Sequence, residues 1–294
     1  METKQNPALA AMLMICASAL IAVANLLAKA LGTNALGPAL HPLQVSQGRF
    51  MFALLAVGTV VAVMRPTFTA PQWRLHMGRT TCGWLGVTLM FAAAAQIPLS
   101  DAVAISFLNP IFTMMLAIPL LGERVGPIRW IAAAFALCGA LVLLRPGAGS
   151  FQPGAVLALL SAMIIGLEII LIKWLSGMQR PLQVLLINNT MGTVIATTAM
   201  LFVWEPPTGA QWVALGGLGF AMISAQTFFV NAMARAEASF VVPFSYATLV
   251  FVTVYDTLIF GVLPDWVSVT GAVIILSGAA LLAWREAVHR RRAA

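Results

Sequence analysis

Long apolar runs separated by short polar connections fill the whole chain. Each run is close to the length of about 20 residues that a helix needs to cross the hydrocarbon core of a bilayer. The connections carry proline, glycine or charge, as at Arg65-Pro66 and Pro206-Pro207, and they leave no room for a soluble domain. The pattern predicts ten transmembrane helices, at approximately residues 8–31, 43–63, 80–95, 102–121, 128–144, 154–174, 182–204, 212–234, 240–263 and 266–284.

The second half of the sequence repeats motifs of the first half with a shift of 139 residues. Pro42-Leu43-Gln44-Val45 recurs as Pro181-Leu182-Gln183-Val184, and Gln72-Trp73 recurs as Gln211-Trp212. Because each copy would hold five spans, an odd number, the second copy enters the membrane from the opposite side. The predicted fold class is an all-α integral membrane protein with ten transmembrane helices in two inverted five-helix repeats, an architecture of many secondary transporters. The predicted repeats are residues 1–146 and 147–294.

Composition and charge agree with a membrane location. Hydrophobic residues make up 61% of the chain and charged residues 9%, values far outside the range of soluble domains. With the N-terminus inside, thirteen Lys and Arg residues fall on the cytoplasmic side, Arg79 among them, and only Arg145 falls outside. The tendency of positive residues to stay inside therefore places both termini in the cytoplasm. The net charge of +7 is explained by this topology, so we expect the lipid bilayer as a partner and no nucleic acid.

The sequence lacks the motifs of enzymes that bury polar groups within a membrane. His41, His76 and His289 are all predicted in loops or tails, which leaves no histidine inside a span for hydrolysis or haem binding. The three cysteines fall within spans and have no metal-ligand spacing, and no phosphate-binding glycine loop is present. We therefore expect no enzymatic activity, no cofactor and no metal, with an intramembrane enzyme or a scaffold as distant alternatives.

Ionisable residues inside spans are expensive in lipid, so each needs an explanation. Arg49 lies about 10 Å below the outer face by helical rise, and it either anchors a substrate carboxylate or is a structural residue bonded to helix-end carbonyls. Glu168 either binds an ammonium group or a proton, or pairs with Lys173 or a polar neighbour. Asp256 is expected to be structural or part of a gate, and Glu168 and Asp256 are both candidates for proton coupling. Lys29 is expected to extend its amine to the outer interface.

Uncharged polar and aromatic residues in the spans are further candidates for a substrate site. Polar side chains either bond helices together or contact substrate, and aromatic side chains either line a cavity or face lipid. The candidate substrate-binding residues are Arg49, Asn25, Trp84, Asn109, Glu168, Asn188, Gln226 and Tyr246. Proline removes a helical hydrogen bond, so Pro110 and Pro243 are candidate gating kinks, or else static bends.

Three short segments of the sequence resemble the characteristic motifs of a transporter family. Leu108-Asn109-Pro110-Ile111-Phe112, followed by Leu120-Leu121-Gly122-Glu123-Arg124, is similar to the EamA family of the drug/metabolite transporter superfamily, and Pro243-Phe244-Ser245-Tyr246 is the second-half counterpart. The resemblance covers nearly the whole chain. It implies ten spans in an inverted repeat with both termini inside, in the inner membrane of a bacterium. Arg49 falls where many members have an arginine in the second span.

The resemblance also implies a function. Members of the family export small metabolites such as amino acids, and the segment that ends at Tyr246 is similar to the aromatic amino-acid exporter branch. We therefore predict a secondary transporter that exports amino acids, aromatic or otherwise neutral, by alternating access, as a monomer or a homodimer. Efflux of drug-like cations is the alternative. The chain departs from the family at Val262, where many members have a glutamate, so any role of that carboxylate is in doubt here.

Overall fold

The computed structural model of the protein describes residues 6–121, 130–131, 134–135, 138–139, 142, 152–175, 179, 181–233, 235, 244–245, 247–274, 276–278 and 281. The long elements of these residues are all α-helices, as predicted. They are α1 (Pro7–Gly32), α2 (Pro42–Met64), α3 (Trp73–Ala94), α4 (Leu99–Ser106), α5 (Asn109–Leu121), α7 (Pro153–Leu175), α8 (Pro181–Met200), α9 (Gly209–Met233) and α11 (Ala247–Phe260). A further apolar helix runs over Trp266–Gly278.

By length and composition, five helical segments of the described residues suffice to cross a membrane. They are Ala8–Gly32, Pro42–Met64, Leu99–Leu120, Pro153–Ile172 and Gly209–Phe229. The all-helical membrane fold is therefore confirmed, while the count of ten spans stays a prediction. The predicted span at 128–144 lies largely outside the described residues, as does the start of the span predicted at 240–263.

Three predicted spans differ from the observed helices. The span predicted at 80–95 begins at Trp73, because a more polar stretch, in which His76 and Arg79 are buried, continues the helix. The span predicted at 102–121 is divided into α4 and α5 by a turn at residues 107–108. Pro110 follows this turn, and a proline disfavours helical conformation in the residue before it and removes one donor. The span predicted at 182–204 ends at Met200.

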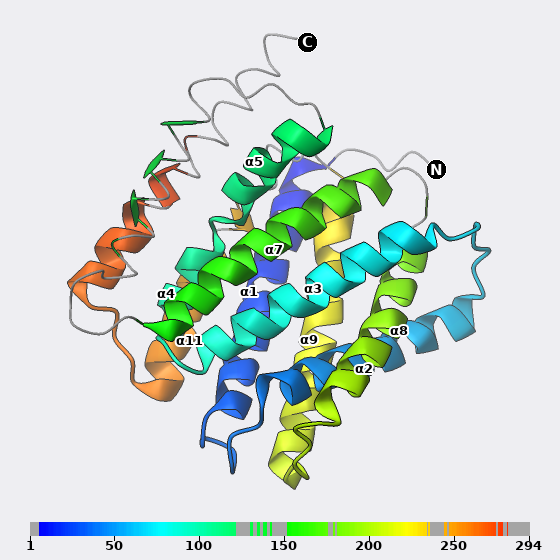
Figure 1. Ribbon diagram of the computed structural model, residues 1–294, viewed down its shortest axis with the longest axis horizontal. Coiled ribbons are helices and arrows are strands. Elements are labelled where there is room, and N and C mark those ends of the chain that lie inside the picture. Colours follow the sequence, from blue (N-terminus) through cyan, green and yellow to red (C-terminus); the bar gives the residue numbers. More distant parts are fainter. Residues whose placement is uncertain are drawn as a thin grey trace.

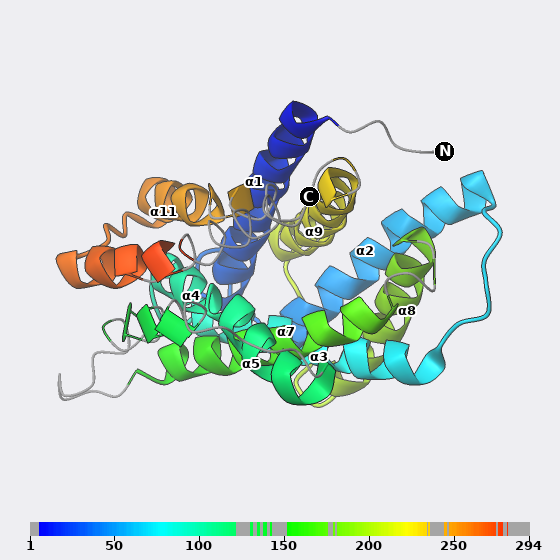
Figure 2. The ribbon, with the colours of Figure 1, turned by 90° about the horizontal axis from the view of Figure 1, so that it is seen from above.

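Each of the three largest helix–helix contacts joins one helix of the first half of the chain to one helix of the second half. The shift of 139 residues makes α7 the counterpart of α1, α8 of α2, and α9 of α3. Accordingly, α1 packs along α9 just as α3 packs along α7, and α2 packs against its own counterpart α8. Figure 1 shows α3 and α7 side by side, and Figure 2 shows the same pair in one layer. Each half thus covers the apolar faces of the other, as expected of a two-repeat transporter fold.

The glutamine of the repeated Pro-Leu-Gln-Val motif makes the same contact in both halves. Nε2 of Gln44 donates to the backbone oxygen of Glu205 (2.6 Å), and the N–H of Glu205 donates to Oε1 of Gln44 (3.2 Å). Gln183 makes both bonds with Thr69, at 2.6 and 3.0 Å. Each glutamine satisfies the backbone of a connection in the other half, so the two contacts hold the halves together at both ends.

Glycines allow α2 and α9 to approach closely. A Cβ atom at Gly48 would lie 2.5 Å from Leu215, and one at Gly219 would lie 2.5 Å from Phe52. Small residues at helix crossings are the usual means of close packing where lipid gives helices no hydrophobic reason to associate. The contact between α2 and α9 is therefore stabilised by the fit of their surfaces as well as by the glutamine contacts.

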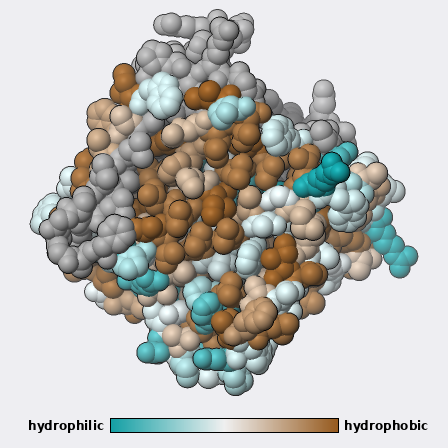
Figure 3. All heavy atoms as spheres, viewed as in Figure 1, coloured by the Kyte–Doolittle hydropathy of each residue, from teal (hydrophilic) through white to brown (hydrophobic). Residues whose placement is uncertain are grey.

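Large apolar side chains cover much of the outside of the bundle. Leu55, Phe202 and Trp266 are 59%, 87% and 86% exposed, respectively. On the face drawn in Figure 3 apolar side chains occupy the centre, and polar side chains gather mostly toward its lower and right-hand edges. A surface of this kind suits contact with lipid rather than water.

The connections sort into two sets, which supports a specific topology test. Those holding Pro38 and Glu205 bond to side chains at one end of the bundle, and those holding Thr69 and Gln179 meet at the other end.

In a variant without native cysteines, single cysteines at positions 4 and 292 are expected to resist a membrane-impermeant thiol reagent in intact cells. Cysteines at 148 and 208 are expected to react. Reaction of position 4 or 292 from outside would contradict the cytoplasmic termini.

Candidate substrate site between the repeats

Three charged side chains lie near one another on α2, α3 and α7. Arg49 of α2 and Arg79 of α3 are only 5% and 6% exposed. Nε of Arg79 lies 3.7 Å from Oε1 of Glu168 on α7, and Glu168 also attracts Arg49 electrostatically. Two guanidinium groups and one carboxylate leave a net charge of +1, which is costly to bury without a partner.

Unpaired polar atoms surround these charges. In the part of the chain that the structure describes, seven buried side-chain nitrogen and oxygen atoms have no hydrogen-bond partner, and they all belong to α2, α3 or α8. They are Nε and Nη1 of Arg49, Nδ1 of His76, Nε of Arg79, Oγ1 of Thr80, Nε1 of Trp84 and Oδ1 of Asn188. Buried polar groups are paired in most proteins, so such a concentration points to a ligand that supplies the partners. We call Arg49, Arg79, Trp84, Glu168 and Asn188 the arginine site.

Contacts among α2, α3 and α8 fix the two arginines of the arginine site. The guanidinium carbon of Arg49 lies 4.3 Å from the centre of the Phe50 ring, and a Cβ atom at Gly192 of α8 would lie 2.3 Å from that ring. Nη1 of Arg79 donates to the backbone oxygen of Val184 (3.4 Å), which lies one helical turn before Asn188. Both arginines are therefore held at the interface of the two repeats, which is where an alternating-access transporter is expected to bind its substrate.

The other predicted substrate residues fall in several places. Asn25, Asn109 and Gln226 are half-buried on α1, α5 and α9, and no hydrogen bond found in the described residues joins their side chains to the arginine site. Pro110 lies in the first turn of α5, directly after the break in the predicted span. Tyr246 and Pro243 lie outside the described residues, so their roles stay predictions.

Two residues of this region were assigned wrongly from the sequence. Arg79 was counted among the cytoplasmic loop residues and His76 was placed in a loop, but both are buried within α3. Nε2 of His76 makes a hydrogen bond of 2.7 Å with Oε1 of Gln179 in the connection after α7. The available signal was the helical spacing of His76, Arg79 and Gly83, which puts two polar side chains and a glycine on one face of the helix.

A second buried ion pair joins the repeats toward the other end of the bundle. Lys29 of α1 pairs with Asp256 of α11, and its amine lies 4.6 Å from the centre of the Phe260 ring. The other carboxylate oxygen of Asp256 accepts the N–H of Leu99 at the start of α4 (3.0 Å). The expectation that Lys29 extends to the interface was therefore wrong, because a carboxylate of the other repeat lies within its reach. These bonds agree with the structural role expected of Asp256.

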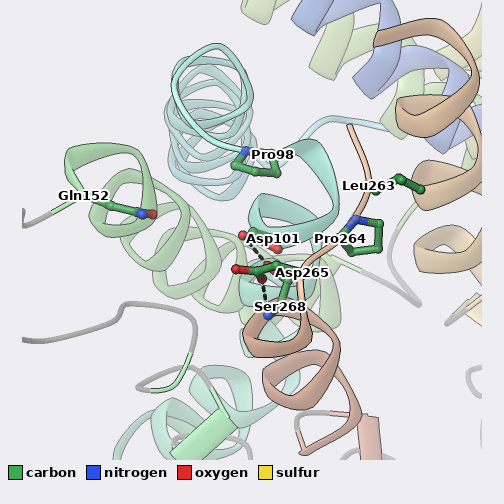
Figure 4. A pocket seen from close by; sticks show the side chains of 7 residues that line it. All are labelled: Pro98, Asp101, Gln152, Leu263, Pro264, Asp265 and Ser268. Atoms are coloured by element: carbon green, nitrogen blue, oxygen red, sulfur yellow. Dashed lines mark hydrogen bonds between the residues drawn. The ribbon is translucent and has the colours of Figure 1, made fainter. Parts of the chain in front are cut away.

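A pocket opens among the connections that precede α4 and α7 and follow α11. Its lining residues are Pro98, Asp101, Gln152, Leu263, Pro264, Asp265 and Ser268 (Figure 4). Ser268 donates its hydroxyl to Asp101 (3.0 Å) and its N–H to Asp265 (2.8 Å), so both carboxylates are bonded. This pocket lies where loops meet the first turns of two helices, and none of the unpaired buried atoms found in the described residues belongs to its lining.

Comparisons with known proteins point to transport. A riboflavin transporter of Rhizobium johnstonii is 33% identical over 250 residues, which is 83% of this chain and 80% of the relative. A riboflavin transporter of Vibrio cholerae is 26% identical over 99% of this chain and 98% of the relative. An S-adenosylmethionine uptake transporter of Rickettsia prowazekii is 25% identical over 85% of this chain and 86% of the relative.

The fold and the sequence profile agree with these relatives. A crystal structure matches 96% of this chain and 99% of its own length with a TM-score of 0.63 at 20% identity, which shows a shared fold. The profile of the EamA-like transporter family matches residues 8–145 and 152–284, and so covers both halves. The relatives indicate a transporter of small metabolites rather than an enzyme. The chain belongs to the EamA-like transporter family.

Proposed function

We propose that the arginine site binds riboflavin or a flavin of similar size, and that the protein carries this substrate across the membrane by alternating access. The observation that carries the proposal is the set of buried, unpaired donors on Arg49, Arg79 and Trp84. An unpaired buried donor costs about 1–3 kcal/mol. A ligand that presents several acceptors would recover this free energy on binding.

The chemistry of riboflavin fits these donors. Its isoalloxazine ring carries two carbonyl oxygens and ring nitrogens as acceptors, and the ring is flat and large enough to pack on the indole of Trp84. A guanidinium group offers paired donors to such a ring edge. The riboflavin transporters among the relatives support this choice of substrate.

The charge of the site argues against cationic substrates. Two arginines and one glutamate leave an excess positive charge in a low-dielectric region, where repulsion is poorly screened. The sulfonium of S-adenosylmethionine and drug-like cations would both meet Arg49 and Arg79. We therefore rank the efflux of cations below transport of neutral or singly anionic metabolites.

Amino-acid export is the second candidate. A substrate carboxylate would pair with Arg49 and an aromatic side chain would pack near Trp84, so the arginine site supports this reading on chemical grounds. Its weakness is that the relatives named above transport riboflavin and S-adenosylmethionine. The direction of transport is set by substrate gradients or coupling ions, so both directions belong in the test.

Proteoliposomes offer a direct test of the substrate. Purified protein is expected to take up riboflavin, followed by its own fluorescence, with saturable kinetics and faster than empty liposomes. Phenylalanine, S-adenosylmethionine and a cationic dye are assayed in the same preparations, in both directions. Transport of phenylalanine without riboflavin would favour the amino-acid candidate. Transport of the dye alone would favour the efflux of cations.

A further inference from the structure

We propose that Gly83 is a positioning residue of the arginine site: it leaves a notch on α3 that holds the carboxylate of Glu168 away from the guanidinium donors used by substrate. This inference rests on the proposed function of the same site. Gly83 is one of three glycines in α3, and the sequence alone does not show which of them faces Glu168.

The notch is defined by the distances around Gly83. A Cβ atom at this position would lie 2.7 Å from Oε1 of Glu168, 3.0 Å from Cδ and 3.2 Å from Oε2. These distances are shorter than ordinary van der Waals contact, so the carboxylate occupies the volume that any other residue would fill. Gly83 lies one helical turn after Arg79 on the same face of α3. The notch therefore sits directly beside the guanidinium group.

The carboxylate in the notch offsets charge without using up donors. Its Oε1 atom is 3.7 Å from Nε of Arg79, which is beyond hydrogen-bond distance. Among the described residues, Nε of Arg79 and both Nε and Nη1 of Arg49 have no hydrogen-bond partner. At this separation the negative charge still lowers the free energy of burying two arginines, since Coulomb attraction falls only slowly with distance. The carboxylate of Glu168 thus neutralises part of the arginine charge, while the guanidinium N–H groups remain available to a ligand.

A closed ion pair would have the opposite effect. Arginine and carboxylate groups normally form short, paired hydrogen bonds when buried. If Glu168 moved off the notch and bonded Arg79 in that way, substrate would have to break the pair before binding. A site whose groups are already arranged for the ligand avoids this free-energy cost of reorganisation. Gly83 is therefore expected to set the affinity of the site through Glu168.

Replacing Gly83 by alanine tests the notch. The added methyl is expected to displace the flexible carboxylate toward Arg79 and to weaken riboflavin binding about tenfold or more, the loss expected when a charged hydrogen bond is no longer available. Gly86→Ala is the matched control. Its Cβ atom would also lie 2.7 Å from a side chain of α7, but that side chain is the apolar Ile165. The control is expected to lower the melting temperature similarly and to leave the dissociation constant within about twofold.

A double-mutant cycle separates positioning from simple packing. In a Glu168→Ala background, Gly83→Ala is expected to have no further effect on riboflavin binding, because no carboxylate is left to displace. Glu168→Asp, whose shorter side chain tolerates the methyl, is expected to restore most of the affinity that Gly83→Ala loses. Equal losses in the Gly83→Ala and Gly86→Ala variants, or additive losses in the cycle, would overturn the inference.

The same cycle is informative without substrate. Melting temperatures of the four proteins are expected to show coupling between positions 83 and 168 in the absence of riboflavin. A wild-type protein that binds no riboflavin would overturn the proposed substrate, and the melting cycle would then decide the notch alone. If the melting temperatures show no coupling between positions 83 and 168, the proposed role of Gly83 is wrong whatever the substrate is.

Discussion

Arg49→Ala is expected to lower riboflavin transport at limiting concentration about 100-fold while the protein still inserts and folds. The reason is that Arg49 offers two buried donors, Nε and Nη1, that have no partner in the described residues. Hydrogen bonds to a charged group contribute about 1.5–3 kcal/mol each, and about 2.7 kcal/mol corresponds to 100-fold. Initial rates in proteoliposomes, with melting temperature measured on the same preparation, check this result.

The stability of the same variants separates binding from a structural role. Arg49→Lys keeps the charge but loses the paired donors, so transport is expected between that of wild type and Arg49→Ala. No acceptor in the described residues is bonded to Arg49, so truncation strands none of them, and the melting temperature is expected to stay equal or rise, as at binding sites where function is kept at the expense of stability. A lower melting temperature together with lost transport would indicate a structural arginine. Wild-type transport by well-folded Arg49→Ala protein would exclude the binding role.

The helices and their duplication could be predicted because they depend on local and repeated sequence. Apolar runs fixed α1, α2, α7 and α9 to within a few residues. The repeated glutamine at Gln44 and Gln183 revealed the two halves, but it did not reveal that each glutamine would bond a connection of the other half. Sequence spacing reports which residues are equivalent, whereas contacts between halves depend on how the helices pack.

The charged residues show where sequence reasoning stops. Arg79 resembled a cytoplasmic anchor because a positive residue near the end of an apolar run usually is one. Its partner Glu168 lies on a helix of the other half, and no sequence pattern pairs two residues so far apart in the chain. Lys29 was assigned to the interface for the same reason, although Asp256 lies within its reach. Arg49 and Asp256 were identified correctly as charges inside spans, and both are buried in the structure.

Lys29→Met is expected to give the largest loss of stability, about 3–5 kcal/mol, because it leaves the buried carboxylate of Asp256 without its cation. Asp256 is 1% exposed, so water cannot replace the amine easily. For a chain of this size, such a loss corresponds to about 10 °C in melting temperature. Arg74→Met is the control, since Arg74 is an exposed cation near the start of α3, and it is expected to change the melting temperature little.

The Lys29→Met/Asp256→Asn double variant is expected to recover most of the lost stability. Asparagine removes the unpaired charge and keeps an oxygen that accepts the N–H of Leu99 at the start of α4. Replacement of a buried ion pair by neutral groups is often close to neutral, whereas removal of one partner is not. Thermal melts of the two single variants and the double variant in the same detergent measure the recovery. If Lys29→Met alone melts like wild type, the amine reaches the interface after all, and Asp256 is held by its bond to Leu99 alone.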